Sequence, residues 1–355
     1  MMNTALNTFL SSISTLKTYL DNIERKNDIL DKTYGLPCTG KDIKDGILDL
    51  QSKRNPEKQF DYSVAIISLY GQYETFVEQI IKEYLKELKQ ENFSFGQLPQ
   101  KLQECYFAKS IKLYPKLEWE KYNHLNTKII SKSLDDALNK DAVNLLPEAF
   151  YTNAGNYKIG VLADCMTDLG VENLKQTVCK YPPLQSYFIR KHGAGFNVDG
   201  KSDDFLFGLL DEVVDTRNKI GHTGKVDEIK DKTYVDDMNT YFECFGKSLN
   251  MLLQDTIFQL KWNSSAVPSF APSNVFNNID VVGFSGVKME IHLGQSYLCK
   301  NPAGFYPVYV QSKVLGIQAR NVDFINYYLR EDNPYGVGMK VNHHSSPGCS
   351  FKFLR

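Results

Sequence analysis

An arginine and a histidine near the end of one amphipathic segment are the residues best suited to chemistry. Arg217 and His222 stand five positions apart after a run of apolar residues, and Asn218 lies directly beside the arginine. A guanidinium holds oxyanions through its forked N–H donors, and an imidazole gains and loses a proton close to neutral pH. The pair could therefore bind an anion and transfer a proton at one centre.

Helical periodicity places Arg217 on the apolar side of this segment. With successive side chains about 100° apart, one sector carries the arginine among Leu206, Leu210, Val213 and Ile220. Burial of an unpaired guanidinium costs on the order of several kcal/mol, so we expect a partner or an anion for Arg217. The opposite sector carries the polar residues Asp211, Asp215, Asn218 and His222.

Two further features bear on this arrangement. Gly221 is expected to end or loosen the helix, which would free His222 to turn toward the cleft of Arg217. A second misplaced charge, Glu74, lies at the margin of the apolar stripe of a helix predicted over residues 61–90. Glu74 could pair with Arg217 or assist His222. The structural alternative is an Arg217–Glu74 ion pair together with a helix-capping role for His222.

The order Arg217-Asn218, three residues and then His222, directly after an apolar helix, resembles the Arg-x4-His signature of the HEPN superfamily (higher eukaryotes and prokaryotes nucleotide-binding). The pair Tyr73-Glu74 is similar to a Tyr-Glu pair in the first core helix of toxin-associated HEPN groups. The resemblance covers about residues 1–262. It implies a homodimer in which two signature helices meet and a composite RNA-cleaving site of Arg217, His222, Asn218 and Glu74, without metal or cofactor.

By this resemblance the chemistry would be cleavage of RNA. The 2′-hydroxyl of RNA is a built-in nucleophile, so a base and an anion stabiliser suffice without a metal. His222 would move the proton and Arg217 would hold the phosphate oxygens, leaving a 2′,3′-cyclic phosphate and a 5′-hydroxyl. We therefore expect an endoribonuclease of the toxin–antitoxin or anti-phage type, with an antitoxin or sensor as a further partner. The alternative is a non-catalytic module that holds a nucleotide, an RNA or a protein, with Arg217 as an anion clamp.

Helices must position these residues, and the sequence predicts a mainly α fold: a HEPN-type helical bundle with a long helical insertion, followed by a small β-rich domain. Apolar spacing predicts a first helix that ends before Tyr34 and a last helix over residues 233–262. Ser202 is expected to cap the signature helix. Within an insertion over about 95–200, the pattern favours helices over residues 98–113, 127–138, 172–179 and 184–191.

Basic and aromatic residues alternate in the first part of this insertion. Lys109, Lys112 and Lys116 precede Trp119, a composition that could grip single-stranded RNA through phosphate contacts and base stacking. A solvated helix face beside ordinary core aromatics is the alternative, and it is the commoner outcome for runs of charge.

Composition changes after the last helix. Residues 263–274 are rich in Ser, Ala and Pro and predict a linker, and the short apolar runs of residues 275–355 predict a small barrel or sandwich of unknown role. His343-His344 with Cys299 and Cys349 fits no standard zinc spacing, so no metal site is expected.

Length and composition set the frame. A chain of 355 residues has room for two cores, and a formal charge of −1 offers no basic sheath for long nucleic acid. Seven scattered cysteines without Cys-x-x-Cys spacing favour a reducing, cytoplasmic setting. No apolar run approaches the roughly 18 residues that predict a membrane span. Because the net charge is close to zero, any contact with phosphate must come from a local basic patch.

Overall fold

The structure is a computed structural model, and it describes residues 3–37, 40–151, 156–226, 228–331, 336–343 and 345–354. The chain divides into two compact units, one reaching to Asn250 and the other starting at Met251. Helices build the first unit, and the described strands β1 to β10 all lie in the second. This confirms the predicted mainly α fold with a small β-rich C-terminal part.

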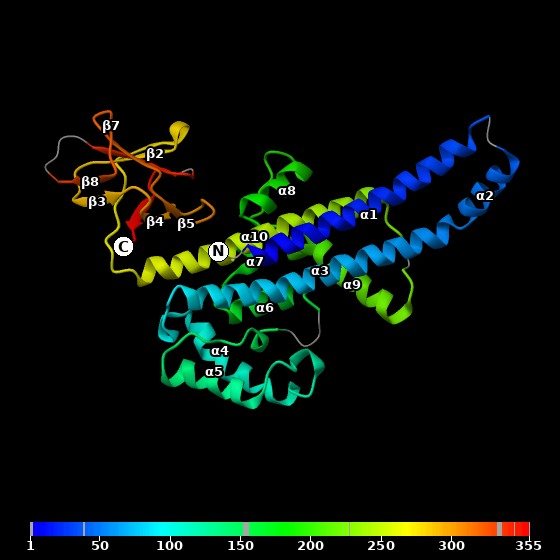
Figure 1. Cartoon of the computed structure of the whole chain (residues 1–355), viewed down its shortest axis with the longest axis horizontal. Helices are drawn as coiled ribbons and strands as arrows, with labels where there is room; N and C mark the ends of the chain where they lie inside the picture. Colours follow the sequence, from blue (N-terminus) through cyan, green and yellow to red (C-terminus); the bar gives the residue numbers. More distant parts are fainter. Residues whose placement is uncertain are drawn as a thin grey trace. The chain divides into compact units, whose positions relative to one another are not determined.

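Long helices frame the N-terminal unit (Figure 1), namely α1 (Thr4–Tyr34), α3 (Arg54–Gln90), α9 (Asp203–Thr223) and α10 (Lys232–Ser264). Helices α1 and α3 lie side by side, and α2 (Lys41–Ser52) connects them along the chain. Aromatic rings fill the space between the helices. Phe9 of α1 stacks on Phe76 of α3 at 4.5 Å, and Tyr73 of α3 meets Phe242 of α10 edge-on at 5.3 Å.

The insertion is helical, as predicted. Its elements are η1 (Phe95–Gln97), α4 (Gln100–Ile111), η2 (Tyr114–Lys116), η3 (Glu120–Tyr122), α5 (Thr127–Asn139), η4 (Pro147–Ala149), α6 (Ile159–Asp168), α7 (Leu174–Val178) and α8 (Pro182–His192). Four of them, α4, α5, α7 and α8, correspond to the helices expected from the apolar spacing.

Two departures from the predicted helices have visible causes. Helix α3 begins at Arg54 and not at Asp61, whose carboxylate instead accepts a hydrogen bond from the Tyr19 hydroxyl of α1 at 2.9 Å. Helix α6 was not predicted. Its first N–H, that of Ile159, donates to the Asp211 carboxylate of α9 at 2.8 Å. A cap supplied by a distant helix leaves no local signal in the sequence.

The C-terminal unit contains short antiparallel strands around one apolar core. Neighbouring strands follow the orders β1-β2-β9-β6-β7, β10-β4-β5 and β3-β8. Their bounds are β1 (Asn274–Phe276), β2 (Val281–Phe284), β3 (Met289–His292), β4 (Ser296–Lys300), β5 (Tyr309–Lys313), β6 (Gly316–Ala319), β7 (Val322–Asp323), β8 (Asn326–Leu329), β9 (Val337–Lys340) and β10 (Ser350–Phe353).

Residues near the predicted linker make defined contacts within this unit. The Asp255 carboxylate, near the end of α10, accepts the N–H groups of Val308 and Tyr309 at 3.0 and 2.5 Å. Phe270 and Phe351 exchange two backbone hydrogen bonds of 2.8 Å. The last turns of α10 therefore belong with the strands, and the linker over 263–274 stays a prediction.

Candidate functional site

The signature helix α9 is capped at both ends. The Ser202 side chain accepts a hydrogen bond from the backbone N–H of Phe205 at 3.3 Å, as its predicted role requires. At the other end Gly224 has a left-handed backbone with φ of 68°, and its N–H donates to the carbonyl of Ile220 at 2.8 Å. The helix therefore includes His222.

The prediction that Gly221 ends this helix is wrong. Gly224 provides the left-handed C-cap, so Gly221 is an ordinary helical residue and His222 keeps its helical direction. Five residues on a helix correspond to about 7.5 Å along the axis and about 140° around it. Within one chain, Arg217 and His222 therefore face different directions.

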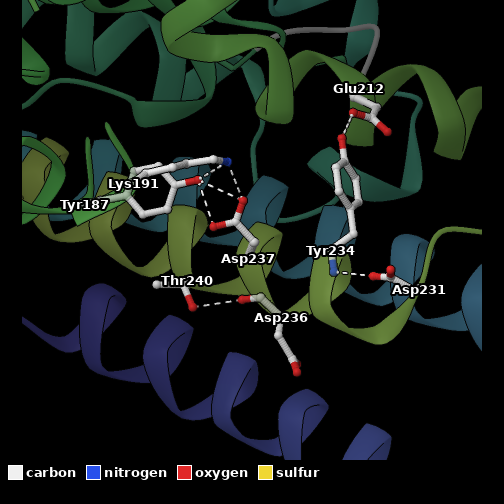
Figure 2. Close-up of polar contacts among 8 residues, drawn as sticks. All are labelled: Tyr187, Lys191, Glu212, Asp231, Tyr234, Asp236, Asp237 and Thr240. Carbon is white, nitrogen blue, oxygen red and sulfur yellow. Dashed lines mark hydrogen bonds and ion pairs between the residues drawn. The ribbon is translucent and has the colours of Figure 1, made fainter. Parts of the chain in front are cut away.

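Tyrosine–carboxylate contacts fasten this helix and α8 to α10. Figure 2 shows Tyr234 of α10 pointing to Glu212 of α9, with its hydroxyl 2.5 Å from the carboxylate. In the same view Tyr187 and Lys191 of α8 converge on Asp237 of α10, at 3.0 and 2.5 Å. The candidate residues therefore lie on a helix whose position is fixed by its neighbours.

Arg217 lies half-buried against α3. Its guanidinium carbon is 4.7 Å from the centre of the Tyr70 ring, and its Nη1 donates to the side-chain oxygen of Asn218 at 2.9 Å. A guanidinium has five N–H donors, and the others have no hydrogen-bond partner among the described residues. The partner of this guanidinium is thus an aromatic face, and several of its donors stay open to an anion.

Glu74 lies within electrostatic reach of Arg217 without pairing with it. Burial raises the pKa of its carboxyl, the Glu78 carboxylate adds to the rise, and Lys121 and Arg217 oppose it. Lys121 instead forms an ion pair with Glu78 at 2.5 Å. In the parts of the chain that the structure describes, no ion pair joins Glu74 to Arg217, so this structural alternative is not what holds the arginine.

Asn218 contacts Arg217 and lies on the same face of α9 as His222. It accepts the hydrogen bond from Arg217, and it precedes the exposed His222 by one helical turn on the same face. The described residues offer His222 no hydrogen bond or ion pair. One chain therefore brings together Arg217, Asn218 and the neighbourhood of Glu74, and it leaves the imidazole of His222 free in solvent.

The lysines predicted to bind RNA gather at one surface of the insertion. Burial lowers the pKa of Lys116, and the positive charges of Lys109, Lys112 and Lys121 lower it further. Trp119 beside them is 49% exposed. These three lysines therefore lie close to Lys116, and with the exposed indole the four lysines form a local basic patch on a chain whose net charge is close to zero.

The contacts that Tyr70 and Lys121 make at the site are not predicted from the sequence. Tyr70 occupies a core position of its helix, which predicts packing and not an arginine contact. Lys121 lies in η3, and only the tertiary fold brings it beside Glu78 and Glu74 of α3. In the sequence, the feature that could have suggested a place for Tyr70 at the site is its position one helical turn before Glu74.

The described residues contain no group of three or more His, Cys, Asp or Glu side chains able to hold a metal ion. His343 contacts the Tyr297 hydroxyl at 3.2 Å and Ser345 Oγ at 3.3 Å, while His344 lies outside the described residues. Within those same residues, the search for a helix long and apolar enough to span a membrane finds none.

Comparison with known proteins gives one match. The model of the RiboL-PSP-HEPN family matches residues 39–255, a segment that holds α3, α9 and most of α10. No curated protein and no solved structure matches the chain. The match confirms the superfamily expected from the Arg-x4-His spacing, whose members are commonly RNases and often bind RNA and dimerise. More than half of the sequence falls within the matched segment, and the chain therefore belongs to the RiboL-PSP-HEPN family of the HEPN superfamily.

Proposed function

We propose that this protein is a metal-independent endoribonuclease of the toxin–antitoxin or anti-phage type. The state of Arg217 supports this most: it is held on the Tyr70 ring with donors open, one residue from Asn218 and five before an exposed His222. A fixed, half-buried guanidinium without a carboxylate partner suits a phosphodiester, whose oxygens gain charge during attack.

The chain's residues would divide the reaction as follows. His222 takes the proton of the 2′-hydroxyl, whose oxygen then bonds to phosphorus. The bond from phosphorus to the 5′-oxygen breaks, and that oxygen receives a proton from an imidazolium. Arg217 holds the non-bridging oxygens, and Asn218 orients the guanidinium. The products are a 2′,3′-cyclic phosphate and a 5′-hydroxyl.

Two copies of α9 would complete the site. Asp215, Lys219 and His222 are exposed at helical spacing on one face. This face has room for a second signature helix. Arg217 of one chain would then approach His222 of the other, although the two residues face different directions within a single chain.

The basic patch would hold the RNA beyond the cleaved bond. Lys109 is already paired with Asp168 at 2.6 Å, so Lys112 and Lys116 are the cations freer to meet phosphate, and Trp119 offers a ring for a base. Lys121 extends the patch toward Glu78 and Arg217's neighbour Glu74. An antitoxin or sensor would act by covering or exposing this surface.

A second candidate is a non-catalytic HEPN module with Arg217 as an anion clamp. The divergence of Arg217 and His222 on one helix favours it, because a single chain binds an anion without placing an imidazole on it.

Cleavage of RNA separates the two candidates. Purified protein with total RNA and EDTA should yield fragments that end in 2′,3′-cyclic phosphate, and Arg217→Ala or His222→Ala should lower the rate by at least about 10²-fold. His124→Ala is the matched control, since this exposed histidine pairs with Glu148 in the insertion. Intact RNA with wild-type protein would exclude the nuclease, and equal cleavage by His222→Ala would exclude the role proposed for His222.

A further inference from the structure

Exposed aromatic rings gather where the insertion meets the start of α9. The ring of Phe196 lies 5.8 Å from that of Phe205 at an interplanar angle of 20°, and 4.9 Å from that of His192 at 29°. The Phe196 ring is thus nearly parallel to both neighbours, whereas the rings of His192 and Phe205 lie 5.1 Å apart and are tilted by 43°. Phe205 is 46% exposed, and His192 is exposed as well.

A buried residue anchors this stack. Phe188 of α8 is 3% exposed, and its ring lies 5.6 Å from Phe196 at 25°. Phe188 also packs against Tyr241 of α10, whose hydroxyl donates to the carbonyl of Leu206 at 2.9 Å. The exposed rings therefore continue a row that begins in the core, and their orientation is set before any ligand arrives.

Among the described residues, Lys201 is a cation beside this stack without an ion pair. The ammonium of Lys201 lies 5.5 Å from the Phe196 ring centre and 5.9 Å from that of Phe205. Of the nearby carboxylates, Asp199 pairs with Lys180 and Asp203 with Lys175, whereas the exposed Asp204 has no ion pair among the described residues. Lys201 forms no ion pair within the described chain, so it can meet a phosphate beside the rings.

We propose that His192, Phe196 and Phe205, with Lys201, form a platform on which a base of single-stranded RNA stacks. The aromatic rings suit stacking on the base of a nucleotide, and the ammonium of Lys201 suits its phosphate. Stacking of this kind tolerates any base. A protein partner is less well matched, because the exposed residues of the loop around Phe196 are mostly glycines and polar residues such as Asn197, and a stable protein interface needs a wider apolar core.

One ring of the platform, that of Phe205, lies on the same helix as the proposed cleavage site. Phe205 precedes Arg217 by twelve residues, about 18 Å along α9. A strand bound at Arg217 needs only a few nucleotides to reach Phe205. This inference rests on the proposed function, since it assigns a second contact to the same RNA.

Binding of a strand that cannot be cut tests the platform apart from catalysis. The full chain is titrated into a fluorescent 2′-O-methyl oligonucleotide, and anisotropy gives the affinity. Phe205→Leu keeps an apolar side chain and removes the ring, so affinity should fall about 5- to 150-fold. Phe60→Leu is the matched control, because Phe60 is 67% exposed on α3 and far along the chain from the stack.

The outcomes separate this inference from the proposed function. Wild-type affinity in Phe205→Leu would overturn the platform even if the protein cleaves RNA. A change in oligomeric mass without a change in affinity would identify the rings as a protein contact and overturn it too. Weaker binding by Phe205→Leu in a chain that cuts no RNA would uphold the platform and reject the nuclease.

Discussion

Mixing two inactive variants would show whether the site is shared between chains. Arg217 and His222 lie about 140° apart on one continuous helix, so a phosphodiester that meets both groups would take them from two copies of the chain. An Arg217→Ala chain keeps its histidine, and a His222→Ala chain keeps its arginine. A dimer of one of each then holds one intact site and one site that lacks both groups.

The expected recovery follows from counting. Random pairing of equal amounts gives heterodimers in about half of the molecules, each with one of its two sites intact, so activity per chain should return to about one quarter of the wild-type value. Each variant alone should fall by about 10²-fold or more, because it lacks proton transfer or anion stabilisation at both sites. The recovered quarter would stand well above that background.

Differently tagged chains, co-expressed and purified through both tags, would give pure heterodimers for assay on a fluorogenic RNA in EDTA. The control pairs a wild-type chain with an Arg217→Ala/His222→Ala chain, which leaves no intact site if the groups come from different chains. Activity in this control heterodimer, with none in the heterodimer of single variants, would refute the shared site and place both groups in one chain.

Two stability predictions follow from the same packing. Burial raises the pKa of the Glu74 carboxyl above its ordinary 4.5, so the folded protein loses stability as pH rises from 4.5 through the raised pKa. Glu74→Gln should therefore be more stable than wild type at pH 7 and equally stable near pH 4. Urea unfolding at both pH values would measure this difference. Lower stability of the variant at pH 7 would mean that attraction to Arg217 outweighs burial. Gly246→Ala would place a methyl group 2.8 Å from the Phe9 ring and should cost about 1–3 kcal/mol of unfolding free energy, whereas Gly71→Ala, with nothing within 4 Å, should gain about 0.5–1 kcal/mol; equal melting temperatures would contradict this.

The sequence was informative where the signal is local. Apolar spacing predicts α1, α9 and α10 because each buries one stripe, and Ser202 predicts the start of α9 because its hydroxyl serves an N–H within three residues. Gly221 and Gly224 show the limit of such signals. Either glycine can end a helix, and the choice falls on Gly224, whose N–H closes on Ile220.

Contacts between distant segments left no such signal. The Asp211 carboxylate that caps α6 and the pairing of Lys121 with Glu78 both join residues far apart in the chain. The contact between the His192 and Phe205 rings also left no local signal, because His192 ends α8 and Phe205 lies in the first turn of α9. Periodicity reports which side of a helix is buried, and it does not report what lies against that side.

Arg217 packs on the Tyr70 ring and forms no ion pair with Glu74 among the described residues, and this matters for the proposed chemistry. An arginine held by Glu74 would have to give up an ion pair before it met a phosphate, and the separated carboxylate would repel the ligand. Tyr70 holds the guanidinium by its face, which leaves the N–H edge and the positive charge uncompensated. Because the pKa of Glu74 is raised, this carboxyl also carries its negative charge less readily. Both features favour an anion at Arg217, and neither depends on whether the anion is then cleaved.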